Sequence, residues 1–222
     1  MPDRPASPYL APDFYIRALA RGRHRDIVGG RWDETGRLQL ALLEAQGMQP
    51  RHRLLDIGAG SLRLGCRAVP FLHPGHYWAT DASRALMLRG RAVELPDPAR
   101  LPEAQLVEDA DFAFPGIPAA IDFAIAFAVF THLPASTLRP ALARLRAACP
   151  HLQRLLLTVF LAPEGHPSSL RQPDGVVTHP DRPPYHRAAA DVLADLSAAG
   201  WTAEHHPDRL PRGQGLIVAC IA

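Results

Sequence analysis

The sequence predicts an α/β protein: a three-layer sandwich around a seven-stranded, mostly parallel sheet, with an antiparallel last strand and an N-terminal helical lid. Short apolar runs typical of buried strands alternate with amphipathic segments typical of helices along most of the chain. A glycine-rich turn at 58–60 joins the first of these runs to a helix. The last two runs, 201–206 and 216–221, have only a loop between them, which favours antiparallel neighbours.

Each expected element follows from a local pattern. Apolar runs predict strands at 54–57, 77–80, 106–107, 121–129, 155–161, 201–206 and 216–221. Apolar residues at helical spacing predict helices at 14–20 and 38–45, from about residue 62, after a Ser83 cap, at 136–149 and at 188–199. Residues 162–186 are rich in Pro, Gly and His and predict a long loop.

These elements divide the chain into three segments. Residues 1–12 contain 4 prolines and are expected to form a disordered or extended lead-in. Residues 13–49 are expected to form a helical N-terminal cap. Residues 50–222 are expected to form the domain that binds the ligand.

Length and composition favour a protein that acts on a small molecule. The 222 residues carry a formal net charge of +2 and are 47% apolar, which predicts a globular domain without a nucleic-acid partner. No apolar run reaches the roughly 18–20 residues that span a bilayer, so we expect no membrane partner. The 3 cysteines are widely spaced, which favours a reducing, cytoplasmic location. We expect a monomer or a homodimer.

The glycine turn and two acids indicate the ligand. Gly58, Gly60 and Gly65 have the spacing G-x-G-x-x-x-x-G, which differs from the G-x-G-x-x-G of dinucleotide-binding proteins. Asp56 precedes the turn by two residues; its carboxylate would repel a pyrophosphate and suit a ligand with an ammonium and a sulfonium group. Asp81 ends the second strand, where an acid accepts ribose hydroxyls. The alternatives are a helix-cap partner for Asp56 and a turn residue for Asp81.

These motifs resemble a known family. LLDIGAGSLRLG at 54–65 is followed by YWATDAS, DFAF and IDFAIAFAVFTHL, and the chain ends in AGW and PRGQGLIVACIA. In this order the segments resemble the class I S-adenosylmethionine-dependent methyltransferases, mainly over residues 50–160. The resemblance implies a Rossmann-like fold, S-adenosylmethionine as cofactor, and methyl transfer to an oxygen, or a nitrogen, of a small molecule.

The resemblance also implies roles for individual residues. Asp56 and the turn would line the methionine half of the cofactor, Asp111 with Phe112 would flank the adenine, and Asp109 is a competing register for that acid. Phe127 would pass close to the sulfonium, or pack as a core aromatic. The cofactor-binding residues expected in this way are Asp56, Gly58, Ala59, Gly60, Arg63, Asp81, Ala82, Asp111, Phe112 and Phe127. Arg63 is expected to bind a carboxylate of cofactor or substrate, or else to be solvated.

The acceptor side is less defined by the sequence. His132 lies just past the fourth strand and is the candidate general base, with a loop-orienting histidine as the alternative. The expected substrate residues are Trp32 in a lid at 29–39, Phe130, and Tyr185 and His186 in the late loop. Packing of Trp32 against the sheet edge and a surface position for the late-loop residues are the alternatives. The histidine spacing contains no HxH or HExxH, so we expect no metal.

Two other functions fit a chain of this kind. One is a regulatory protein that binds the cofactor without turnover. The other is an NAD-dependent oxidoreductase, because an acid after the second strand is shared by NAD-binding proteins. The identity of the acceptor is not written in the sequence.

Overall fold

The computed structural model describes residues 7, 9, 13–165 and 168–222, without the side chains of 208 and 209. The expected lead-in at 1–12 therefore lies outside the described residues, apart from Ser7 and Tyr9. Across the described residues, no helix combines the length and apolar character needed to cross a bilayer.

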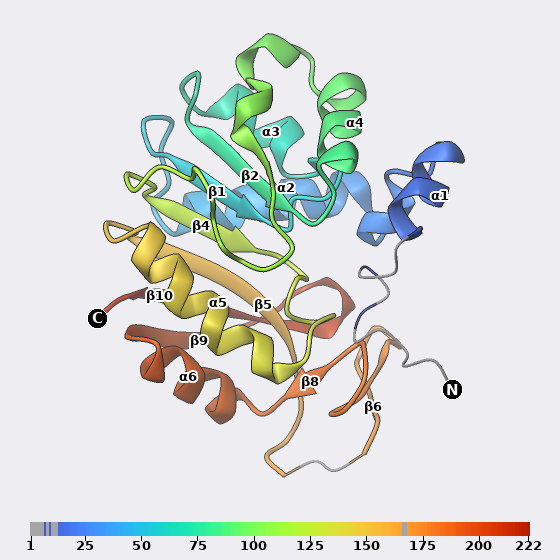
Figure 1. Cartoon of the computed structure of the whole chain (residues 1–222). Coiled ribbons are helices and arrows are strands. Elements are labelled where there is room, and N and C mark those ends of the chain that lie inside the picture. The colour runs from blue at the N-terminus through green and yellow to red at the C-terminus, as the bar shows by residue number, and fades with distance from the viewer. Residues whose placement is uncertain (1–6, 8, 10–12, 166–167) are drawn as a thin grey trace.

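A single mixed sheet forms the centre of the molecule, as predicted (Figure 1). Its strands follow the order β3-β2-β1-β4-β5-β10-β9, and a short strand, β8, pairs with β5. All of these pairings are parallel except those of β10, which runs antiparallel to β5 and β9. The strands are β1 Leu54–Ile57, β2 Tyr77–Asp81, β3 Leu106–Glu108, β4 Phe123–Ala126, β5 Arg154–Leu161, β8 His186–Arg187, β9 Trp201–Arg209 and β10 Gln214–Ile221.

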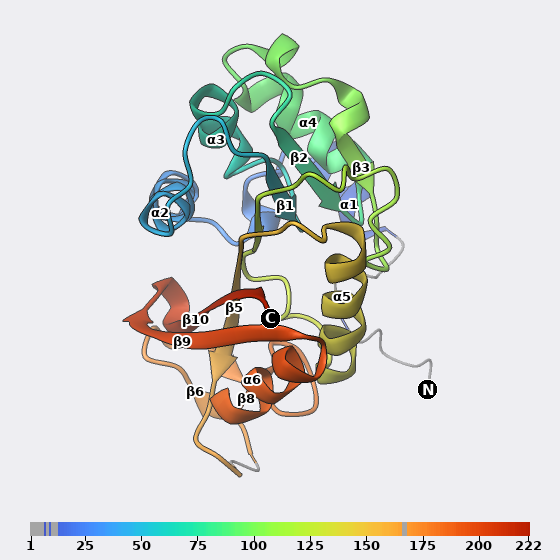
Figure 2. The same cartoon turned by 90° about the vertical axis from the view of Figure 1, so that its left-hand side faces the viewer.

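Helices cover both faces of this sheet, which makes three layers (Figure 2). One apolar cluster packs α2, α3 and α4 against β1 and β2, and a second packs α5 and α6 against β4 and β5. The central strands β1, β4 and β5 are nearly uniformly apolar because both their faces are buried. The helices are α1 Phe14–Ala20, α2 Trp32–Ala45, α3 Gly65–Phe71, α4 Arg84–Glu94, α5 Ala135–Ala148 and α6 Ala189–Ala198.

Three elements differ most from their predicted bounds. The expected strand at 121–129 is confined to Phe123–Ala126, and Ala128, in a left-handed conformation (φ 61°), turns the chain away from the sheet. The helix expected at 38–45 begins at Trp32, so residues 32–39 of the predicted lid at 29–39 are helical. The predicted late loop contains β8 and a two-stranded ribbon, β6 Leu170–Arg171 with β7 Val177–Thr178.

Candidate functional site

A cavity of about 250 Å³ lies at the carboxyl ends of β1, β2 and β4, next to the glycine turn. Ligands of open α/β sheets bind at this edge. Its floor comes from the turns that follow the strands, and its roof comes from the N-terminal segment that precedes α2. The roof residues are Ser7, Tyr9, Tyr15, Ile27, Val28, Gly29 and Arg31.

Asp56 is a buried carboxylate that lines this cavity. The Tyr77 hydroxyl donates a hydrogen bond to its Oδ2 at 2.6 Å. Burial raises the pKa of Asp56 to about 7, although the bond from Tyr77 and the positive charge of Arg63 both lower it. A cation bound nearby would stabilise the ionised form of this buried carboxylate.

The turn after β1 brings the backbone up to the cavity. Gly58 and Gly60 have left-handed φ values of 70° and 58°, which favour glycine. A Cβ on Gly60 would lie 2.5 Å from Cγ1 of Val28, so the roof packs directly on the turn. Ala59 also lines the cavity, and its N–H is held by the carbonyl of Thr80 at 3.0 Å.

Asp81, at the end of β2, is the second buried carboxylate of the cavity. Its two oxygens accept the backbone N–H groups of Gly60 and Ser83, each at 2.9 Å. Burial raises the pKa of Asp81 to about 6 against these two bonds. Each oxygen keeps a second lone pair for a hydroxyl donor in the cavity, which Ala82 also lines.

The turn after β3 selects between the two acids expected at the adenine. Asp109 lines the cavity, and its carboxylate accepts the N–H groups of Asp111, Ala113 and Phe114. Asp111 is exposed and is absent from the described lining. Asp109, the alternative to Asp111 in the sequence interpretation, is therefore the acid that lines the cavity. Phe112 lines the cavity as expected.

A buried polar chain fixes the backbone after β4. Gln214 and Thr158 share a hydrogen bond of 2.7 Å, and the Thr158 hydroxyl in turn accepts the N–H of Ala128 at 2.7 Å. Phe127, next to Ala128, is buried and lines the cavity. The two polar side chains thus hold the segment predicted to pass the sulfonium.

His132 lines the cavity from the loop after β4. Its ring packs edge-on against Tyr9, with ring centroids 5.0 Å apart. Burial lowers the pKa of His132 to about 4, and the positive charge of Arg212 adds to this. The imidazole is therefore neutral near physiological pH and able to accept a hydrogen bond or a proton.

Arg63 and Arg212 hold the roof down from two sides. The Arg63 Nη1 donates to the carbonyls of Val28 and Gly30, at 2.7 and 3.3 Å. The Arg212 Nη2 donates to the carbonyl of Gly29. Arg63 is buried rather than solvated, and burial lowers its pKa to about 10.

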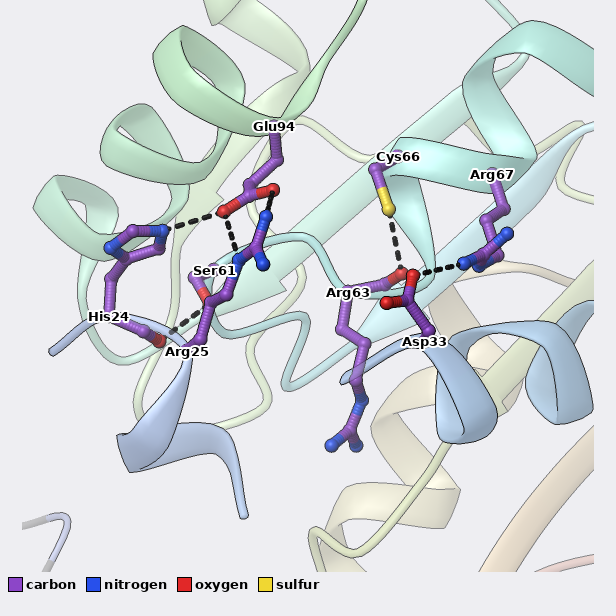
Figure 3. A network of polar contacts seen from close by, with 8 residues as sticks. All are labelled: His24, Arg25, Asp33, Ser61, Arg63, Cys66, Arg67 and Glu94. Carbon is purple, nitrogen blue, oxygen red and sulfur yellow. Dashed lines mark hydrogen bonds and ion pairs between the residues drawn. The ribbon is translucent and has the colours of Figure 1, made fainter. Parts of the chain in front are cut away.

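The N-terminal segment is also anchored on its outer side (Figure 3). Glu94 of α4 binds His24 at 2.7 Å and Arg25 through two hydrogen bonds of 2.6 and 2.7 Å. Asp33 of α2 pairs with Arg67 of α3 at 2.7 Å. Figure 3 shows Arg63 between these two clusters. These contacts thus join the N-terminal segment and α2 to helices α4 and α3.

Four residues expected at the substrate do not belong to the described lining of the cavity: Trp32, Phe130, Tyr185 and His186. Trp32 begins α2, and the Arg25 guanidinium lies 5.1 Å from its ring centroid. Phe130 stacks on Phe112 at 5.5 Å. His186 shares a hydrogen bond of 2.8 Å with Thr178, and the N–H of Tyr185 binds the carbonyl of Thr131.

Tyr9 and Tyr15, which the sequence suggested as additions to the lid, line the cavity. Several other lining residues escaped the sequence interpretation: Thr35, Gln39, Phe160, Arg212 and Gln214. The sequence did carry a signal for the pair Thr158 and Gln214, because both are polar residues in otherwise apolar strands, β5 and β10. Within the part of the chain that the structure describes, no cluster of three or more His, Cys, Asp or Glu could hold a metal.

Comparisons with known proteins agree with this architecture. No family model matches the chain, and no curated protein matches it. An amino pentose methyltransferase from Micromonospora echinaspora, solved with S-adenosylmethionine, is 20% identical with a TM-score of 0.60, and the match covers 94% of this chain and 97% of that one. Magnesium protoporphyrin IX methyltransferase from Synechocystis PCC 6803, also with S-adenosylmethionine, is 17% identical with a TM-score of 0.60, over 94% of both chains.

A third similar structure is larger than this chain. It is a provisionally named O-methyltransferase from Nostoc punctiforme PCC 73102, 17% identical with a TM-score of 0.64, and the match covers 96% of this chain but 62% of that one. At these identities the likeness shows the fold. The chain has the fold of class I S-adenosylmethionine-dependent methyltransferases, as its motifs predicted.

Proposed function

We propose that this chain, built on the class I methyltransferase fold, transfers a methyl group from S-adenosylmethionine to an oxygen, or a nitrogen, of a small molecule. One observation carries the proposal: two buried carboxylates, Asp56 and Asp81, line a single cavity beside the Gly58–Gly60 turn. S-adenosylmethionine would give each of them a partner, its ammonium group for Asp56 and its ribose hydroxyls for Asp81.

The methionine half of the cofactor matches the charges beside β1. Its ammonium group would pair with Asp56, whose raised pKa reflects burial that a bound cation offsets. Its carboxylate would pair with Arg63, which is buried and whose Nε has no hydrogen-bond partner among the described residues. The backbone of Gly58 and Gly60 lines the cavity, where its polar groups can meet the ligand.

The adenosine half matches the ends of β2 and β3. Asp81 would accept the two ribose hydroxyls with the lone pairs that Gly60 and Ser83 leave free. Asp109 and Phe112 would flank the adenine, with a carboxylate on its edge and a ring on its face.

The bound cofactor would supply an electrophilic methyl group, and the chain's own residues would align the acceptor. Alignment of two reactants contributes on the order of 7–11 kcal/mol to such displacements. The roof covers the cavity, and Phe127 and His132 line it. Neutral His132 would accept the proton of a hydroxyl or amine acceptor. The predictions of a cytoplasmic protein and of a monomer or homodimer stay predictions.

Calorimetry with S-adenosylhomocysteine tests the cofactor site. Asp81→Ala should weaken binding by about 100-fold or more, the effect of removing a charged acceptor from two hydroxyls. Asp97→Ala is the matched control, because Asp97 also accepts an N–H two residues ahead, at 3.0 Å, and lies outside the described cavity lining. Equal affinity in wild type and Asp81→Ala would overturn the ribose role, and binding of NAD without S-adenosylhomocysteine would overturn the proposal.

Turnover is tested with a donor that carries an isotopically labelled methyl group. Mass spectrometry should find the label on a small molecule from a broad acceptor panel, and no label when Asp81→Ala is used. Cofactor binding without transfer to any acceptor would instead indicate a regulatory protein.

A further inference from the structure

The cavity is divided electrostatically along the sheet. Its carboxylates, Asp56, Asp81 and Asp109, lie in or directly after β1, β2 and β3. Residues after β4 and between β9 and β10, on the other half of the sheet, carry Arg212 and the neutral ring of His132. Arg212 meets Arg63 at the roof, where it binds the Gly29 carbonyl between the two carbonyls that Arg63 holds. A cationic ligand is therefore favoured at one end, and an anionic group at the other.

Arg212 is held in place by its backbone. It lies in the turn Pro211–Gly213 with a left-handed φ of 66°, which a residue with a side chain rarely adopts. The Asp174 carboxylate accepts its N–H at 2.7 Å, which fixes this conformation. The guanidinium lines the cavity and donates to the Gly29 carbonyl. The turn thus directs a positive charge at the cavity.

Among the residues that the structure describes, no carboxylate forms an ion pair with the guanidinium of Arg212, which is an exposed residue. Arg31, in contrast, lies 3.8 Å from both Glu34 and Asp174. The bond to Gly29 uses part of its planar fork, and the remaining N–H groups suit a carboxylate. The positive charge of Arg212 also acts on His132 and Tyr9 across the cavity.

The walls around this charge are apolar and aromatic. The rings of Tyr9 and His132 pack 5.0 Å apart, and Phe160, Leu133 and Val176 complete the lining at this end. Flat aromatic ligands gain from such surfaces. Arg31, Arg63 and Arg212 all line the cavity, and Arg212 acts electrostatically on both rings, those of Tyr9 and His132. A guanidinium beside apolar and aromatic walls is an arrangement that suits an aromatic acid.

We propose that the methyl acceptor is an aromatic monocarboxylic acid whose carboxylate pairs with Arg212. A hydroxyl or amine elsewhere on the acid would take the methyl group from the sulfonium, its proton would pass to His132, and S-adenosylhomocysteine would leave. This inference rests on the proposed function, since it concerns the second ligand of the same cavity. The cofactor's own carboxylate is assigned to Arg63, which lies close enough to Asp56 for the two charges to affect each other's pKa. Arg212 is thereby left for the acceptor.

Matched ligand pairs test the proposal on the whole chain by calorimetry. The pairs are 4-hydroxybenzoate with 4-hydroxybenzamide, 4-hydroxycinnamate with 4-hydroxycinnamamide, and indole-3-acetate with indole-3-acetamide, each with and without saturating S-adenosylhomocysteine. At least one acid should bind about tenfold more tightly than its amide, the effect of one charged pair. Arg212→Gln should reduce that preference to within about twofold, and Arg212→Lys should retain part of it.

Arg171→Gln is the control variant. It also removes one positive charge and one arginine–carbonyl bond, to Gly175 at 3.0 Å, but Arg171 lies outside the described cavity lining. Its acid preference should match the wild type. Equal binding of acids and amides, a preference that survives Arg212→Gln, or no binding of any acid would overturn the inference. Weakened S-adenosylhomocysteine binding in Arg212→Gln, with the acid preference intact, would assign Arg212 to the cofactor. Failure of the wild type to bind S-adenosylhomocysteine would count against the proposed function alone, because the acid arm also runs without it.

Discussion

Replacing Tyr77 with Phe isolates the influence of one hydroxyl on the ionisation of Asp56. The hydroxyl donates to Asp56 Oδ2 at 2.6 Å, and both side chains are buried. A hydrogen bond to a charged group contributes about 1.5–3 kcal/mol, which corresponds to a factor of about 10–100 in an ionisation constant. Tyr77→Phe should therefore keep Asp56 protonated to a higher pH.

The effect on affinity depends on pH. The ligand's ammonium group needs the ionised carboxylate, so affinity should follow the ionised fraction of Asp56 as the pH rises. Burial raises the Asp56 pKa to about 7, so about half of the wild-type sites are ionised near about pH 7 and nearly all near about pH 9. We expect Tyr77→Phe to weaken S-adenosylhomocysteine binding by about 5- to 50-fold near about pH 7, and by about twofold or less near about pH 9.

Calorimetric titrations with S-adenosylhomocysteine between about pH 6 and about pH 9 measure this difference. The control ligand is 5′-methylthioadenosine, which lacks the amino acid part, so its affinity should be equal in both proteins at every pH. A loss that is the same at all pH values, or that also affects 5′-methylthioadenosine, would refute the reasoning and assign Tyr77 a packing role.

Three further substitutions test other parts of the site. Because the raised pKa of Asp56 favours its protonated form in the fold, its stabilising contribution is complete below an unfolded-state pKa of about 3.9 and is lost as the pH rises through about 7. Chemical denaturation of ligand-free Asp56→Asn should therefore show a smaller fall in stability over this window than wild type, and parallel curves would contradict the assignment. His132→Ala should slow methyl transfer by about 100-fold without changing S-adenosylhomocysteine affinity. Because burial lowers the pKa of His132 to about 4, the pH profile of the wild-type rate should show no inflection from His132 above about pH 6. Full activity in the variant would leave His132 a structural role. Gly60→Ala places a methyl group 2.5 Å from Val28 at a φ of 58° and should weaken cofactor binding by about tenfold or more. Gly116→Ala, at a φ of 69° in open space, should cost about 1 kcal/mol of folding free energy and leave binding unchanged; equal binding losses would contradict the packing argument.

Local patterns predicted the sheet because its central strands are buried on both faces. Apolar runs such as 54–57 and 155–161, each with one polar residue, are typical of that environment. The β6, β7 and β8 strands escaped prediction because two residues are too few to show an alternation. The start of α2 was hidden by Gly36, which lowers helix propensity. The structure gives Gly36 a reason, since a Cβ there would lie 2.9 Å from the carbonyl oxygen of Arg63.

Local sequence patterns also predicted only part of the site. Residues next to the strand ends, such as Asp56 and Asp81, could be placed because the strand positions them within a few residues. The choice between Asp109 and Asp111 depends on how one carboxylate caps three N–H groups, which spacing does not show. Arg212 lines the cavity because of long-range contacts and an unusual backbone angle, so no local sequence pattern predicts its position.

The bond between Arg212 and the Gly29 carbonyl joins positions 183 residues apart. During synthesis, the segment that roofs the cavity therefore emerges well before the arginine that binds it. A chain made as far as β5 can form β1, β2, the glycine turn and the bonds of Arg63 to the roof, but it lacks the bond from Arg212. Formation of the Pro211–Gly213 turn thus completes the wall of the cavity, and contacts of such long sequence separation form late in folding.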